Sequence, residues 1–292
     1  MRKAESELIL NSDGSIYHLN LKKEDVATTI ITVGDPERVQ HVSKHFDNIE
    51  LKKTKREFEI HTGNIGSKRI TVLSTGMGTD NIDIVFNELD ALFNIDFSTR
   101  TICDNLTSLD IIRIGTSGAI QPDIPIDSFL ATETAIGLDG LMGFYSTKNN
   151  AQHQTYLQTI QPIVENLGVK PSVSIASEKL LTQLAADMPK GITLTNAGFY
   201  APQGRSLRLT PTHKNYIDEC AALVFDDGKR ITNMEMETSG IYGLSNLLGH
   251  HAISLNAILA NRANGTFSAD ANKTVNRLIE LTLERIVANS NT

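Results

Sequence analysis

Three β-branched and apolar runs, each ending at a glycine, constrain the fold of this chain more than any other feature. Residues 28–33 (TTIITV) precede Gly34, residues 69–75 (RITVLST) precede Gly76, and residues 111–114 (IIRI) precede Gly115. Such runs are typical of buried strands, and glycine lets a chain turn where a strand ends. Helical patterns follow the first two glycines. These units predict an α/β fold.

Strands and helices alternate along the rest of the chain. We expect further strands at 128–134, 172–176, 191–195 and 251–259, and helices at 79–93, 154–167, 178–186, 239–248 and 270–289. The chain has 292 residues, 40% of them hydrophobic, which is enough for one large core. No repeat or linker interrupts it, so we expect one domain over 1–292. Polar residues 94–109 are expected to form an irregular insertion loop, and the basic residues 52–58 a solvated edge strand or loop.

Composition argues against several classes of protein. The formal net charge is −7 and no basic stripe is present, so we expect no nucleic-acid partner. Cys103 and Cys220 lack the spacing of a disulfide framework or a metal site, which favours a reducing cytoplasm. The N-terminus is charged throughout, unlike a signal peptide, and no apolar run approaches the ~18 residues of a membrane span. We therefore expect a soluble cytoplasmic protein with no membrane contact.

Arginines on or near the glycine turns predict a phosphate site. Arg38 follows Gly34, Arg113 precedes Gly115, and Arg56 lies in the basic segment. A phosphate dianion requires several donors and more than one positive charge, and arginine supplies both. A strand that ends in a glycine turn and a helix N-terminus is also a natural anion site.

Simpler interpretations of these residues remain open. Asp35 could cap the helix with Arg38 at the surface, and Arg113 could pair with a carboxylate while residues 115–118 only turn the chain. No GxxxxGK[ST] or GxGxxG motif is present, so we do not expect a triphosphate or dinucleotide site.

Two more groups of polar residues could carry chemistry. Glu235 and Glu237 would share one face of an extended segment. Such a pair can bind the vicinal hydroxyls of a sugar, bind a metal or act as acid and base; alternatively it is a solvated acidic face. Gln203 and Arg205 follow Phe199, and an amide, a guanidinium and an aromatic ring suit a planar base. An ordinary polar loop could have the same composition.

The motifs occur in an order that resembles the nucleoside phosphorylase family I, and its uridine phosphorylase branch in particular. The segments that carry the resemblance are GDPERV (34–39), REF (56–58), STGMG (74–78), RIGTSGAI (113–120), FYAPQGR (199–205), MEMET (234–238) and ANR (260–262). The resemblance implies a three-layer α/β/α domain whose central mixed sheet is partly closed as a barrel.

The resemblance also implies roles for individual residues. Phosphate would be bound by Gly34, Arg38, Arg56, Arg113 and Thr116. Ribose would be bound by His18, Thr116, Met236 and Glu237, with Glu235 in support. The base would be bound by Phe199, Gln203, Arg205 and Arg262. The catalytic residues would be Arg113, Glu237, Gln203 and Arg205. Arg56 and His18 would be lent to a neighbouring subunit, which implies a homo-oligomer of at least two subunits, with a hexamer as an alternative.

The implied reaction is the reversible phosphorolysis of uridine to uracil and ribose 1-phosphate, with inorganic phosphate as co-substrate and no cofactor. A purine nucleoside phosphorylase is the main alternative, although Asn261 stands where purine-cleaving relatives place a protonating aspartate. A nucleosidase that uses water and a nucleoside-binding sensor are more distant alternatives, and Arg38 and Arg113 argue against the nucleosidase. Glu57 matches part of a monovalent-cation site of some relatives, but Asn81 replaces a serine there, so we expect no metal.

Overall fold

The computed structural model describes residues 2–147 and 150–289. Within these residues, one mixed sheet contains 11 strands. The strands are β1 (Thr29–Val33), β2 (Asn48–Lys55), β3 (Phe58–Ile65), β4 (Lys68–Ser74), β7 (Asp110–Ala119), β8 (Phe129–Leu138), β9 (Ser172–Ile175), β10 (Lys190–Asn196), β11 (Ile231–Glu235), β12 (His251–Asn261) and β13 (Thr266–Phe267). A separate hairpin joins β5 (Ile95–Asp96) and β6 (Thr101–Ile102).

Five strands of the large sheet close into a ring. β7 pairs with β12, β12 with β8, β8 with β10, β10 with β11, and β11 again with β7. The first half of β7 also pairs with β1, from which β4, β3 and β2 extend the sheet. β7 therefore belongs to the barrel and to the open sheet at once. The expected barrel-like mixed sheet is confirmed.

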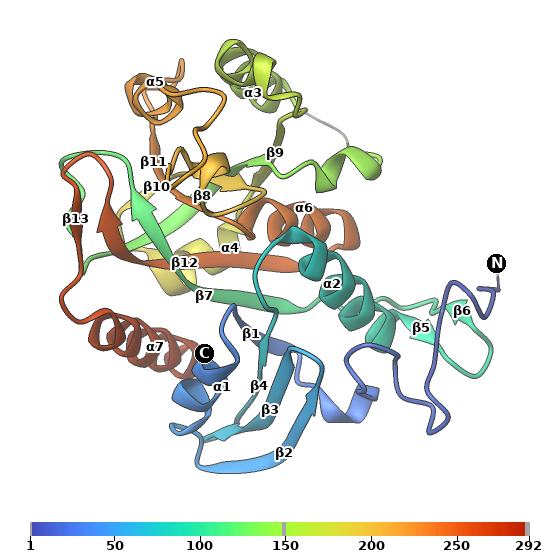
Figure 1. Ribbon diagram of the computed structural model, residues 1–292. Coiled ribbons are helices and arrows are strands. Elements are labelled where there is room, and N and C mark those ends of the chain that lie inside the picture. The colour runs from blue at the N-terminus through green and yellow to red at the C-terminus, as the bar shows by residue number, and fades with distance from the viewer. Residues whose placement is uncertain (1, 148–149, 290–292) are drawn as a thin grey trace.

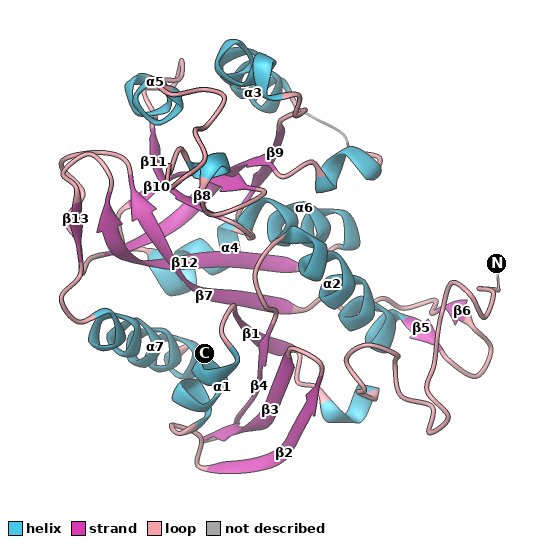
Figure 2. Ribbon diagram, in the orientation of Figure 1, coloured by secondary structure: helices cyan, strands magenta, loops and turns pink. Residues whose placement is uncertain are grey.

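Helices cover both faces of this sheet (Figure 1). The α-helices are α1 (Pro36–Ser43), α2 (Thr79–Asn94), α3 (Ala151–Val164), α4 (Glu178–Ala185), α5 (Tyr216–Ala222), α6 (Thr238–Leu248) and α7 (Ala271–Ala288). Short 3₁₀ helices lie at Lys23–Asp25, Leu141–Phe144, Glu165–Leu167 and Ala201–Gln203. Apolar residues of α2 and α6 form one core, and those of α1, α4 and α7 form another. A third core joins α3 and α5 to β8, β10 and β11. The three-layer α/β/α expectation is confirmed, and Figure 2 shows the layers by element type.

The expected turn at Gly115 is wrong. β7 continues through residues 115–119 and remains paired with β12 over this stretch. The glycine serves a different purpose, because a Cβ atom on Gly115 would lie 1.8 Å from Nη1 of Arg113. The missing side chain gives the guanidinium space to lie over its own strand.

The expectations for two surface segments have different outcomes. Residues 48–55 form the edge strand β2, so the prediction of a solvated edge is confirmed for residues 52–55. It is wrong for Phe58, which begins β3 and is 1% exposed. Residues 94–109 are not wholly irregular, because they contain the β5–β6 hairpin. Asn94 fixes the base of this segment: its Nδ2 donates to the carbonyl of Thr107 at 3.1 Å and its Oδ1 accepts that residue's N–H at 2.7 Å. That the segment is an insertion stays a prediction.

The cysteines and the helices bear on the expectations of no disulfide and no membrane span. Cys103 is half-buried and Cys220 is fully buried, and both are free thiols. Among residues 2–147 and 150–289, none of the helices combines the length and the apolar composition needed to cross a membrane.

Candidate active site

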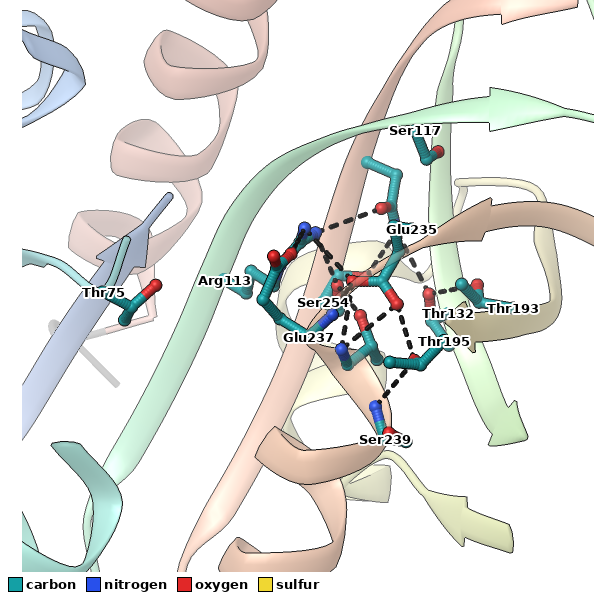
Figure 3. A network of polar contacts seen from close by, with 12 residues as sticks. Thr75, Arg113, Ser117, Thr132, Thr193, Thr195, Glu235, Glu237, Ser239 and Ser254 are labelled. Atoms are coloured by element: carbon teal, nitrogen blue, oxygen red, sulfur yellow. Dashed lines mark hydrogen bonds and ion pairs between the residues drawn. The ribbon is translucent and has the colours of Figure 1, made fainter. Parts of the chain in front are cut away.

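Arg113 lies at the centre of a buried polar network (Figure 3). It projects from β7 and is 6% exposed. Its Nη1 donates to Ser254 Oγ at 3.3 Å and to Asn256 Oδ1 at 3.2 Å, both on β12. Its Nη2 donates to Glu237 Oε2 at 2.6 Å and lies 3.1 Å from Glu235 Oε2. Burial alone would lower the pKa of Arg113, but the two carboxylates raise it. The simpler interpretation is therefore right that Arg113 pairs with carboxylates, and wrong that residues 115–118 only turn the chain.

The two glutamates lie where β11 passes into α6. They are 4% and 6% exposed, so they do not form a solvated acidic face. Glu235 Oε2 accepts the N–H groups of Glu237 at 2.9 Å and Thr238 at 3.0 Å, and Oε1 accepts the Thr195 hydroxyl at 2.6 Å. Burial raises the pKa of Glu235, and the second carboxylate adds to this effect. Glu237 Oε1 accepts the N–H of Gly78 at 2.9 Å, which ties α6 to the second glycine turn.

The first glycine turn confirms one expectation and corrects another. Asp35 Oδ1 accepts the N–H of Glu37 at 3.0 Å and caps α1, as expected. The simpler interpretation placed Arg38 at the surface, but the side chain is half-buried. Its Nη1 is 3.4 Å from the carbonyl of Ile114 on β7. Burial lowers the pKa of Arg38, and the positive charge of Arg113 lowers it further.

The first two glycine turns lie against each other. A Cβ atom on Gly34 would be 3.4 Å from the carbonyl oxygen of Gly76. The structure thus gathers Arg38, Gly78, Arg113, Glu235 and Glu237, here called the Arg113 cluster, at the carboxyl ends of β1 and β4. Two guanidinium groups and two carboxylates share one buried region there. Such a region can hold an anion and accept hydrogen bonds from hydroxyl groups.

A second cluster, here called the base cluster, contains Phe199, Gln203, Arg205 and Arg262. Arg205 Nη1 donates to Gln203 Oε1 at 2.6 Å and to the carbonyl of Phe199 at 2.8 Å, and its guanidinium carbon lies 3.8 Å from the Phe199 ring centroid. Arg262 Nη1 donates to the carbonyl of Gln203 at 2.9 Å. Burial lowers the pKa of Arg205, and the charge of Arg262 lowers it further. Negative charge on a bound group would therefore be favoured here.

The residues of β7 connect the two clusters. Gly115 lies under the side chain of Arg113, and a Cβ atom on Gly118 would be 3.8 Å from Arg205 Nη2 and from Arg262 Cγ. The half-buried Thr116 stands between these two glycines in the sequence. Half-buried Met236 lies between the two glutamates at the end of β11. Of the phosphate and base residues that the resemblance implies, Arg113 and Thr116 lie on β7 itself, and Gly118 of the same strand lies against Arg205 and Arg262.

His18 and Arg56 lie outside both clusters. His18 Nδ1 is 2.6 Å from Glu88 Oε1 on α2. Arg56 is exposed between β2 and β3, with its guanidinium 5.8 Å from the Tyr17 ring centroid. Among the residues that the structure describes, neither side chain has a hydrogen bond or ion pair with the Arg113 cluster. Their role in a neighbouring subunit's site stays a prediction.

Sequence reasoning missed the residues that support the Arg113 cluster. These are Ser254 and Asn256 on β12 and Thr195 on β10. The signal for the first two was present, because they alternate with apolar residues in the ISLNAIL stretch and so face one side of a strand. Nothing in the sequence around Thr195 marks its contact with Glu235.

Comparison with known proteins defines the family. Residues 28–289 match the model of the phosphorylase superfamily. The chain therefore belongs to the phosphorylase superfamily, and the resemblance found in its motifs is confirmed.

Several relatives carry the name uridine phosphorylase. The one from Thermococcus kodakarensis is 31% identical over 263 residues, which cover 89% of this chain and 83% of the relative. The one from Haemophilus influenzae is 30% identical, and the match covers 85% of this chain and 86% of the relative. A crystal structure of a Trypanosoma brucei nucleoside phosphorylase, described as showing uridine phosphorylase activity, is similar at a TM-score of 0.89 and 29% identity. The match covers 97% of this chain and 100% of that one. A DeoD-type purine nucleoside phosphorylase of Buchnera aphidicola is 24% identical, covering 94% of this chain and 100% of the relative.

Proposed function

We propose that this chain is a uridine phosphorylase, a pentosyltransferase that cleaves uridine with inorganic phosphate and needs no further cofactor. One observation carries the proposal: β7 lies against both the Arg113 cluster and the base cluster. The uridine phosphorylases among the relatives support the choice of substrate. The free cysteines fit a reducing compartment such as the cytoplasm.

The reaction divides between the two clusters. A phosphate oxygen forms a bond to C1′ while the bond from C1′ to the base nitrogen breaks, and the electron pair leaves with the base. Arg38 and Arg113, with Gly34 and Thr116, would hold the phosphate below the sugar. Glu237, beside Met236, would accept hydrogen bonds from the ribose hydroxyls and orient C1′.

The base cluster would stabilise the departing uracil. Arg205 already binds the carbonyl oxygen of the Gln203 amide, so the amide N–H can donate to a carbonyl of the base. Arg205 and Arg262 place positive charge where negative charge grows on the ring, and each such donor typically contributes a few kcal/mol to the transition state. Phe199 would provide a stacking surface.

An assay with uridine, thymidine and inosine, each with and without phosphate, tests the proposed function. We expect uracil and ribose 1-phosphate from uridine only when phosphate is present. Release of free ribose without phosphate would identify a nucleosidase, and faster cleavage of inosine would identify a purine enzyme. Either result would overturn the proposal.

Asn261 provides a test of base preference. It is 1% exposed, its Nδ2 donates to the carbonyls of Gln121 at 2.9 Å and Ile124 at 2.8 Å, and its Oδ1 accepts the N–H of Asn264 at 3.0 Å. Asn261→Asp would turn a carboxylate toward two carbonyl oxygens. We expect the free energy of unfolding to fall by about 1–3 kcal/mol, with no gain in inosine cleavage. Chemical denaturation and the inosine assay measure both effects.

Asn264→Asp is the matched control, since this exposed side chain makes one bond, to the carbonyl of Pro122 at 3.0 Å. Its loss of stability should be smaller. Inosine cleavage by a stable Asn261→Asp variant would contradict the prediction.

We also propose that the active unit is a homo-oligomer, a dimer or a hexamer, in which His18 and Arg56 complete the site of a neighbouring subunit. Arg56→Ala and Arg113→Ala should each be inactive alone. When the two variants are refolded together, mixed dimers contain one intact site. Random pairing therefore restores about a quarter of the sites, measurable as phosphate-dependent uracil release.

The control for this experiment pairs Arg113→Ala with Gly115→Ala, because both changes affect the same subunit's half of a site and no mixture restores it. Equal activity in both mixtures, or none in either, would contradict sharing between subunits.

A further inference from the structure

Glu235 is as deeply buried as Glu237, but it makes different contacts. Its Oε1 accepts the Thr195 hydroxyl at 2.6 Å, and its Oε2 accepts the N–H groups of Glu237 and Thr238 at 2.9 and 3.0 Å and lies 3.1 Å from Arg113 Nη2. A carboxylate has about four lone-pair positions, two on each oxygen. The N–H of Thr238 also lies 3.2 Å from Oε1, so Oε1 faces Thr195 and Thr238, and Oε2 faces Glu237, Thr238 and Arg113. Glu235 therefore has no acceptor position left for a substrate.

Glu235 accepts hydrogen bonds from backbone N–H groups at the start of α6. The first N–H groups of a helix have no partner inside the helix and are costly to bury unpaired. Glu235 accepts those of Glu237 and Thr238, and Thr195 Oγ1 accepts that of Ser239 at 2.9 Å while it donates to Glu235. These side chains, from β11 and β10, fix the position at which α6 begins. Glu237 is the residue that precedes this helix.

The charge of Glu235 is unfavourable for anion binding, because a carboxylate beside Arg113 offsets part of the attraction between that arginine and phosphate. Its value to the site must therefore lie elsewhere. Its hydrogen bonds with the backbone of Glu237 and Thr238 point instead to the orientation of Glu237.

We propose that Glu235, supported by the Thr195 hydroxyl, is a positioning residue. It orients Glu237 toward the ribose hydroxyls and keeps its carboxylate within hydrogen-bond distance of Arg113. This inference rests on the proposed function, in which Glu237 binds those hydroxyls. Glu235 touches neither substrate in this scheme. Its effect reaches the substrate through the backbone of Glu237 and the first turn of α6.

Direct binding of two nucleosides to the full-length protein without phosphate tests the proposal. Uridine has the 2′ and 3′ hydroxyls that would donate hydrogen bonds to Glu237, and 2′,3′-dideoxyuridine lacks both. Thr195→Val removes the hydroxyl but keeps the shape of the side chain, so we expect uridine to bind about tenfold more weakly, with less than about a twofold change for the dideoxynucleoside. Isothermal titration calorimetry measures both dissociation constants.

The matched variants separate positioning from a general loss of structure. Thr195→Ser keeps the hydroxyl and should bind uridine as the unmodified protein does. Glu235→Gln keeps an oxygen acceptor for the N–H groups and removes the charge, so uridine should bind within about threefold of the original affinity, with phosphate bound as tightly or more tightly. Glu235→Ala removes every contact and should show the largest selective loss of uridine affinity.

Three outcomes decide the proposal. Selective loss for uridine in Thr195→Val supports it. Equal weakening of both nucleosides, or unchanged uridine binding in a folded Thr195→Val protein, would overturn it. The unmodified protein is assayed first: if it cleaves inosine and not uridine, the proposed function fails, and the same comparison with inosine and 2′,3′-dideoxyinosine still tests the role of Glu235.

Discussion

Replacing Arg113 with alanine is expected to abolish phosphate-dependent cleavage of uridine, lowering kcat/KM for phosphate by at least about a thousandfold. Arg113 supplies both positive charge and directed N–H groups, and its Nη1 is fixed by Ser254 and Asn256. No other arginine of the cluster can take its place, because Arg38 approaches from α1 and contacts the backbone of β7. Steady-state kinetics with varied phosphate measure the loss.

The same substitution should also reduce stability. Arg113 is the guanidinium partner of both Glu235 and Glu237, and removing one partner of a buried ion pair typically costs about 3–5 kcal/mol. Folding must therefore be checked by chemical denaturation before the kinetic result is interpreted.

Arg113→Lys is the control that keeps the charge between the carboxylates. A lysine ammonium cannot serve the acceptors on β12 and both carboxylates with the planar geometry of a guanidinium. We expect a smaller loss of stability, with activity still reduced about a hundredfold. Near-normal turnover by a folded Arg113→Ala protein would contradict the assignment of Arg113 to phosphate.

Replacing Gly115 with alanine is also expected to have a large effect, a loss of at least about a hundredfold in kcat/KM. The new Cβ atom would lie 1.8 Å from Nη1 and 2.3 Å from Cζ of Arg113, far inside van der Waals contact. The guanidinium would have to leave its place between β12 and the two glutamates. The effect should appear mainly as a raised KM for phosphate, because the direct contacts of the base cluster are unchanged.

Two glycine substitutions serve as controls for this experiment. Gly118→Ala on the same strand places its Cβ atom at ordinary contact distance, 3.8 Å from its nearest neighbours, and Gly143→Ala meets nothing within 4 Å. Both should retain most of the phosphate affinity. If Gly115→Ala bound phosphate as well as Gly118→Ala does, the placement of Arg113 over its own strand would be wrong.

Two strands of the open part of the sheet, β1 and β4, could be predicted because their signals are local. Residues 28–33 and 69–75 combine β-branched residues with a following glycine, and they form β1 and β4 almost residue for residue. The barrel strand β7 could not be delimited in the same way. Gly115 has the sequence appearance of a strand end, and only the presence of Arg113 above it explains a glycine inside a strand.

For the site as well, some features could be predicted from local motifs and others depend on tertiary contacts. The motifs identified Arg38, Arg113, Glu237, Gln203 and Arg205, and the structure places them in two clusters joined by one strand. Sequence alone left open whether Glu235 was a solvated charge, because the residue type does not show whether a glutamate is exposed or buried. Its partners come from β10, β7 and the first turn of α6, and their convergence depends on how the barrel closes.

The sequence by itself determined the class of fold, the family and the identity of the arginines and glutamates that we propose carry the chemistry, because strand and turn preferences and motif order are properties of short segments. The tertiary structure alone decided which of these charges meet. Arg113 is 124 residues from Glu237 and 143 from Asn256 in the chain. Only the pairing of β7 with β12 and β11 brings these groups within hydrogen-bond distance. Burial then makes each contact strong, because water no longer competes for the buried charges.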